Sequence, residues 1–89
     1  MRNFIPSKEL TFHTVPLDRA RLITYLQDTS ATTCCVDLSR VTHCDSAGLA
    51  LLIEAKRLAR FYQKDFLIHQ IPDKVVALIE FCGVKTILS

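Results

Sequence analysis

The chain has 89 residues, of which 49% are hydrophobic and 22% are charged. This length predicts one domain with a single modest core, and this apolar content argues against intrinsic disorder. Eleven basic residues against nine acidic ones leave a formal charge of only +2, and the basic residues are scattered along the chain. A nucleic-acid backbone is neutralised by a dense basic stripe, so nucleic acid is not an expected partner.

The first half of the chain predicts a strand, a helix and a second strand. Glu9–Thr14 alternates apolar and polar residues, which is typical of a half-buried strand. Pro16 and Asp18 open a helical stretch that reaches about Thr29. Cys34–Leu38 is short, mostly apolar and β-prone, as in a buried central strand.

The second half continues the alternation. We expect a strand end with its loop over Ser39–Cys44 and then a helix over Ser46–Tyr62. A strand over Lys64–Gln70, a helix over Lys74–Cys82 and a final short strand over Lys85–Leu88 follow. Asp73 opens the third helix, and Gly83 is a natural left-handed stop for it. The order β-α-β-α-β-α-β predicts an α/β domain with about three helices and a mostly parallel sheet of four to five strands.

The N-terminal segment shows no secretory signal, because Pro6, Lys8 and Glu9 precede any long apolar core. The longest uncharged apolar run, from Ala47 to Ile53, is far shorter than the roughly 20 residues that span a bilayer. We therefore predict a single cytoplasmic domain over residues 1–89 without direct membrane insertion. Residues 1–8 form its poorly defined N-terminal edge.

The four cysteines are Cys34, Cys35, Cys44 and Cys82. Without export they are expected to be free thiols in a reducing compartment. No Cys-x-x-Cys spacing occurs, and neighbouring residues of a strand point to opposite faces. We interpret all four as buried structural cysteines and expect neither a metal site nor a cofactor.

Chemical motifs are sparse in this sequence. His43, Cys44 and Asp45 are neighbours along the chain, whereas a nucleophile and its base normally meet across a fold. There is no glycine-rich phosphate loop, no His-Glu-x-x-His and no pair of candidate catalytic carboxylates. The sequence therefore predicts no enzymatic activity and no catalytic residues.

The second predicted helix has more apolar surface than one sheet needs. At about 100° per residue, one continuous stripe contains Ala47, Leu51, Leu52, Ala55, Leu58, Ala59 and Tyr62. The opposite side holds Leu49, Ala50, Ile53 and Phe61 among the charged residues Glu54, Lys56, Arg57 and Arg60. These outer residues are either scattered surface hydrophobes or a partner-docking patch with a positive rim.

The start of this helix carries three informative residues. Asp45 and Ser46 are both good N-cap residues, and Gly48 permits close approach of another backbone segment in the first turn. Ordinary capping explains these features. A serine at a helix N-terminus also suits phosphorylation, because the helix dipole and the free N–H groups stabilise the added charge.

The segments Val36–Val41 and Asp45–Leu52 together resemble the signature of the STAS family, which includes anti-anti-sigma factors and the C-terminal domains of sulfate transporters. Its pattern is a buried strand, a variable loop, and Asp-Ser/Thr-x-Gly at the start of a helix. The likeness runs from about Glu9 to Leu88, with Asn3–Ile5 left to supply a first strand. The runs Leu38–Val41, Gly48–Leu52 and Asp73–Val75 are similar to the small STAS subunits of Mla-type phospholipid-transport ABC transporters.

This resemblance implies a non-catalytic subunit that binds the ATPase of an ABC transporter. It would lie at the inner face of the inner membrane through this partner and would support the assembly and activity of a complex that maintains outer-membrane lipid asymmetry. The implied partner surface is Asp45, Ser46, Ala47, Gly48, Leu49, Ile53, Lys56, Arg57 and Arg60. Ser46 would be its centre, Leu49 and Ile53 its apolar anchors, and the three basic residues its rim.

The alternative is an anti-anti-sigma factor in a partner-switching circuit. Its partner would be an anti-sigma kinase, and Ser46 would be the phosphoacceptor. Phosphate on this serine would release the partner by its charge and bulk.

Overall fold

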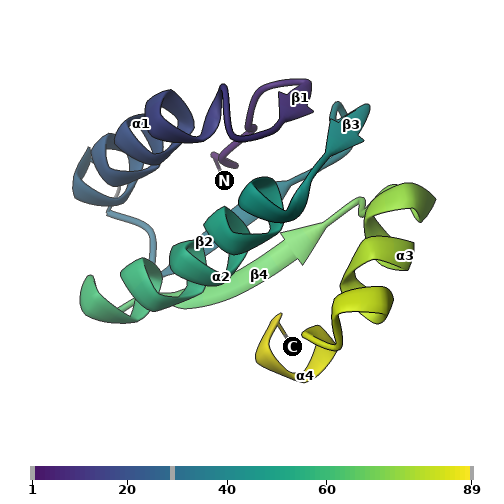
Figure 1. The fold of residues 1–89 in the computed structure, drawn as a ribbon. Coiled ribbons are helices and arrows are strands. Elements are labelled where there is room, and N and C mark those ends of the chain that lie inside the picture. The colour runs from purple at the N-terminus through teal and green to yellow at the C-terminus, as the bar shows by residue number, and fades with distance from the viewer. Residues whose placement is uncertain (1, 29, 89) are drawn as a thin grey trace.

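The computed structural model describes residues 2–28 and 30–88. Figure 1 shows helices that pack beside short parallel strands in a small α/β domain. In chain order the elements are β1 (Glu9–Leu10), α1 (Val15–Asp28), β2 (Thr33–Asp37), β3 (His43–Cys44), α2 (Ser46–Phe61), β4 (Asp65–His69), α3 (Asp73–Cys82) and α4 (Lys85–Leu88). The predicted α/β class and parallel strand pairing are confirmed.

The strands form two parallel pairs. β2 pairs with β4 in the register Thr33↔Asp65 to Asp37↔His69, and β1 pairs with β3. Phe4 adds a parallel bridge to Val36 on the other side of β2. The backbone N–H of Phe4 donates to the carbonyl of Cys35 at 2.8 Å. The N-terminal edge is therefore anchored to the central strand.

The core lies between these strands and α1, α2 and α3. Its most deeply buried side chains are Leu10, Leu22, Leu26, Cys34, Cys35, Val36, Leu38 and Leu52. One charged side chain, Asp18, is also fully buried. Its carboxylate accepts hydrogen bonds from the Ser7 hydroxyl at 2.9 Å and from Arg21 at 2.8 Å. A buried carboxylate requires such partners, and these bonds attach the N-terminal segment to α1.

The first predicted strand is shorter than expected. Pairing ends at Leu10, and the next four residues form a turn that leads into α1. The Thr14 hydroxyl donates to the Glu9 carbonyl at 2.6 Å and accepts from the Thr11 N–H at 3.0 Å. This side chain offers the backbone local partners in place of a strand ladder. Phe12, which an extended strand would have turned inward, is 64% exposed as a result.

The predicted final strand over Lys85–Leu88 is wrong, because this segment is the short helix α4. Gly83 adopts the expected left-handed conformation, with φ of 69°, and ends α3. The chain then coils again beside α2, where Lys56 donates to the carbonyl of Ile87 at 2.7 Å. The prediction that the first helix reaches Thr29 concerns a residue outside the described part of the chain.

The cysteine prediction is only partly right. All four are free thiols, and Cys34 and Cys35 are buried in β2. Cys44 is half-buried, whereas Cys82 is exposed at the end of α3. The last residues of α3 face solvent, and the Cys82 thiol is therefore not buried in the core.

Candidate functional site

Asp45 holds the start of α2 in place through both carboxylate oxygens. Oδ1 accepts the N–H of Gly48 at 2.9 Å, which caps the helix, and Oδ2 accepts the N–H of Phe12 at 3.1 Å. These two hydrogen bonds, the first above all, lower the pKa of the Asp45 carboxyl. The side chain therefore remains an anion at neutral pH and joins the β1–α1 turn to α2.

Gly48 is required by a close contact with β1. A Cβ at this position would lie 2.0 Å from the carbonyl oxygen of Leu10 and 3.0 Å from Sγ of Cys44. The same Leu10 oxygen accepts the N–H of Asp45 at 3.2 Å. The first turn of α2 thus rests directly on the β1 backbone, and only glycine leaves enough room.

Asp45 and Gly48 therefore have structural roles, which leaves Ser46 as the exposed residue of the motif. Ser46 is the first residue of α2 and is open to solvent. Helical spacing places it in line with Ala50, Ile53 and Arg57. We define the outer face of α2 as Ser46, Ala50, Ile53, Arg57, Arg60 and Phe61, all of which are exposed except the half-buried Ile53.

The placement of Leu49 on this outer face is wrong, because the side chain is only 3% exposed and belongs to the core cluster. Leu49 and Lys56 are seven residues apart and share one flank of α2. Lys56 binds the last turn of α4, so this flank faces the C-terminal segment. Ile53 is half-buried, while Ala50 and Phe61 are exposed.

The predicted basic rim is divided among different partners. Arg57 makes a two-pronged ion pair with Glu54 at 2.6 and 2.9 Å, and Arg19 of α1 contacts the same carboxylate at 3.0 Å. Hydrogen bonds from Arg57 and then Arg19 lower the pKa of Glu54 to about 2. Lys56 lies against α4, and Arg60 is exposed. The three basic residues therefore do not form one continuous rim.

Sequence reasoning missed several exposed apolar side chains, among them Phe12 and Leu17. Phe12 and Leu17 are each 64% exposed, and the N–H of Phe12 is bound to Asp45 at the start of α2. The ring of Phe12 stacks on His13 with a centroid separation of 4.0 Å. The threonines around Phe12, at positions 11 and 14, were the available signal that the strand ends early.

The site has little reactive character. Burial, together with the charge of Asp45, raises the pKa of the Cys44 thiol to about 11, so this thiol is protonated at neutral pH. Within residues 2–28 and 30–88, no three His, Cys, Asp or Glu side chains are grouped to hold a metal ion. In the same ranges, no helix is long and apolar enough to cross a membrane.

The fold and this site define a small α/β domain whose second helix presents a capped N-terminus and an exposed face. A family model described as "Mlab, STAS domain" matches residues 8–89, which is nearly the whole chain. The chain belongs to the STAS domain family. No curated protein matches it.

Proposed function

We propose that this chain is a non-catalytic STAS subunit of an inner-membrane phospholipid-transport ABC complex. It binds the ATPase subunit, supports assembly and activity of the complex, and thereby contributes to outer-membrane lipid asymmetry. It lies on the cytoplasmic side and reaches the membrane through its partner. The family description, which names Mlab, supports this choice within the STAS domains.

The outer face of α2 is the observation that carries the proposal. Asp45 caps the helix and Gly48 packs against β1, and both residues therefore have structural roles. Ser46 lies between them and is exposed to solvent. Ala50 and Phe61 are exposed apolar residues on a helix whose other side already fills the core. An exposed apolar strip beside charged residues is typical of a protein-docking surface.

We call the surface proposed for ATPase binding, which is the outer face of α2 together with Phe12, the docking face. It differs from the partner surface that the sequence predicted. Ile53 stays as a half-buried anchor, and Ala50 replaces Leu49 one turn below Ser46. Phe12, whose backbone N–H is bound to Asp45 and whose ring is 64% exposed, adds an apolar side chain near the helix start. Arg57 and Arg60 lie at the far end, where charges affect association rate and specificity more than affinity.

Substitution of Ser46 by lysine tests the proposal. The change places a long cation at the centre of the docking face and leaves the Asp45 cap and the Gly48 contact in place. We expect the purified variant to fold normally and to lose binding to the ABC ATPase of its source organism in a pull-down assay. Ser30→Lys is the matched control, because Ser30 is exposed in the loop after α1. Wild-type ATPase binding by folded Ser46→Lys would contradict the proposal.

The alternative function, an anti-anti-sigma factor, is favoured by one observation. The Ser46 residue is exposed at a helix N-terminus, where a phosphate is stabilised by the dipole and the adjacent N–H groups. Incubation with an anti-sigma kinase of the source organism distinguishes the two functions. A mass gain of one phosphate on Ser46, absent from Ser46→Ala, would support this alternative.

A further inference from the structure

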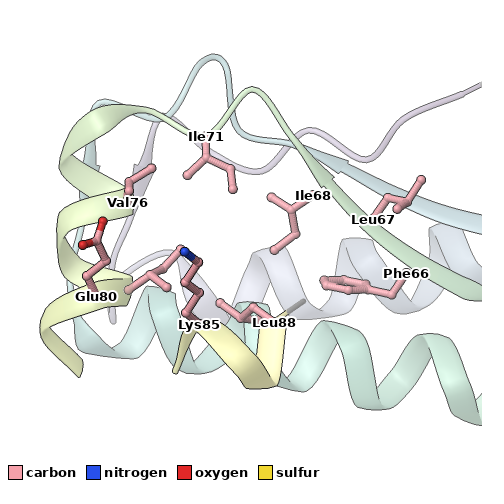
Figure 2. Close-up of a pocket in the computed structure, with 9 residues that line it drawn as sticks. Phe66, Leu67, Ile68, Ile71, Val76, Glu80, Lys85 and Leu88 are labelled. Carbon is pink, nitrogen blue, oxygen red and sulfur yellow. The ribbon is translucent and has the colours of Figure 1, made fainter. Parts of the chain in front are cut away.

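The short helix α4 forms one wall of a hollow beside α2. This hollow has a volume of about 520 Å³, and its lining residues are Ile53, Lys56, Arg57, Arg60, Thr86 and Ile87. Lys56 joins the two helices, because its ammonium group donates to the carbonyl of Ile87 at 2.7 Å. Leu88 of α4 instead lines the separate apolar cavity beside β4, where Figure 2 shows it with Phe66. The α2–α4 hollow therefore continues the outer face of α2 onto the C-terminal segment.

Two isoleucines give the α2–α4 hollow an apolar part. Ile53 of α2 is half-buried, and Ile87 of α4 is 50% exposed. Ile53, Arg57 and Arg60 follow one another at helical spacing along the same side of α2. A side chain that fills the hollow therefore contacts apolar and guanidinium groups together and removes water from both.

The two arginines of the hollow differ in their partners. The ion pairs in the described ranges belong to Arg19, Arg21 and Arg57. Arg57 is bound to Glu54 at 2.6 Å, although its side chain is still 63% exposed. Arg60 is exposed and belongs to none of these pairs. Water therefore solvates Arg60 as long as the hollow is open.

Filling the hollow creates a need for hydrogen-bond acceptors at Arg60. A guanidinium has five N–H donors and does not lose its proton in proteins. Asp65 lines a neighbouring hollow with Arg60, but the ion pairs of the described residues do not join the two. A charge that loses its water without gaining a partner opposes binding. The occupant must therefore bring its own acceptor, and a carboxylate matches the planar fork of arginine.

We propose that the ATPase subunit inserts an acidic side chain with an apolar neighbour into the α2–α4 hollow. The carboxylate accepts hydrogen bonds from Arg60, and the apolar side chain packs between Ile53 and Ile87. This inference rests on the proposed function, which supplies the partner, and it adds α4 and the chemistry of the contact. A charge on a solvated rim acts mainly on association rate, whereas Arg60 in the filled hollow also contributes to affinity.

Affinity measurements with the purified ABC ATPase of the source organism test this contact. Arg60→Glu should weaken binding about tenfold or more, because a repulsion replaces a desolvated attraction. Arg40→Glu is the matched control and should bind like the parent, since Arg40 is exposed in the turn after β2. Ile87→Ala should also weaken binding, because it shortens one apolar wall while the backbone bond to Lys56 remains.

These measurements separate the two levels of the account. If folded Arg60→Glu binds as tightly as the parent while Ser46→Lys does not bind, the inference is overturned and the proposed function stands. If the parent itself does not bind the ATPase, both are overturned.

A zero-length crosslink identifies the acceptor. In the complex of Arg60→Lys with the ATPase, a carbodiimide joins the introduced amine to a carboxylate in contact with it through an amide bond. Mass spectrometry should find this amine joined to a glutamate or aspartate of the ATPase that has an apolar neighbour. Arg40→Lys should give no such product. An Arg60→Lys complex without this crosslink, or equal yields at both positions, would overturn the inference.

Discussion

Gly48→Ala should destabilise the domain, although alanine is the better helix former. Without a steric conflict, this replacement in a helix gains up to about 1 kcal/mol. Here the new Cβ would lie 2.0 Å from the Leu10 oxygen, and contacts below 3.0 Å essentially do not occur, so β1 and α2 must separate by about 1 Å. Overpacking of this kind costs about 1–3 kcal/mol. Movement of the Leu10 carbonyl also weakens its hydrogen bond with Asp45, which contributes about 1 kcal/mol.

We therefore expect a net loss of about 1–3 kcal/mol in the free energy of unfolding, measured by urea titration and far-ultraviolet circular dichroism. Gly83→Ala is an informative comparison, because a Cβ there meets nothing within 4 Å and only the positive φ opposes it. That variant should lose about 1 kcal/mol from backbone strain alone. A Gly48→Ala protein as stable as the parent, or more stable, would refute the close contact between α2 and β1.

Two further substitutions test the site. Asp45→Ala should cost about 1–2 kcal/mol at neutral pH through loss of the helix cap. Because the folded pKa of Asp45 is lowered, its contribution is present above the unfolded pKa of about 3.9 and disappears as pH falls through the folded value. The difference between parent and variant should therefore shrink in urea titrations below about pH 4, and a pH-independent difference would argue against this role. Leu49→Ala should lose about 2–4 kcal/mol as a core truncation, clearly more than the half-buried Ile53→Ala, and equal losses would place Leu49 outside the core.

Local patterns in the sequence predicted most of the fold. In most elements the hydrophobic periodicity and the residues that start or stop a helix indicate the same boundaries. The helix from Ser46 has a cap, a continuous apolar stripe and no proline, and its observed end at Phe61 lies one residue from the predicted one. Gly83 stops α3 in the expected conformation. Glu9–Thr14 does alternate apolar and polar residues, but the strand ends at Leu10. The Thr14 hydroxyl binds the Glu9 carbonyl and so competes with strand pairing.

The docking face was less predictable. A helical wheel shows the direction in which each side chain points but not which other segments cover that side of the helix. Leu49 points away from the main stripe, and only the tertiary packing shows that its side chain belongs to the core cluster. Residues 85–88 have no periodicity long enough to distinguish a strand from a helix. The proximity of Phe12 to Asp45 depends on a contact between segments 33 residues apart. Sequence alone does not specify such a contact.

Site-specific photocrosslinking tests the docking face most directly. A benzoylphenylalanine at exposed Ala50, next to Ser46, would be activated in cells of the source organism, and the crosslinked partner identified by mass spectrometry. The same group at Thr24, exposed on α1, is the control. We predict that Ala50 captures the ATPase subunit of a phospholipid-transport ABC complex and that Thr24 does not. Capture of an anti-sigma kinase at Ala50, or of the ATPase only at Thr24, would contradict the proposed function.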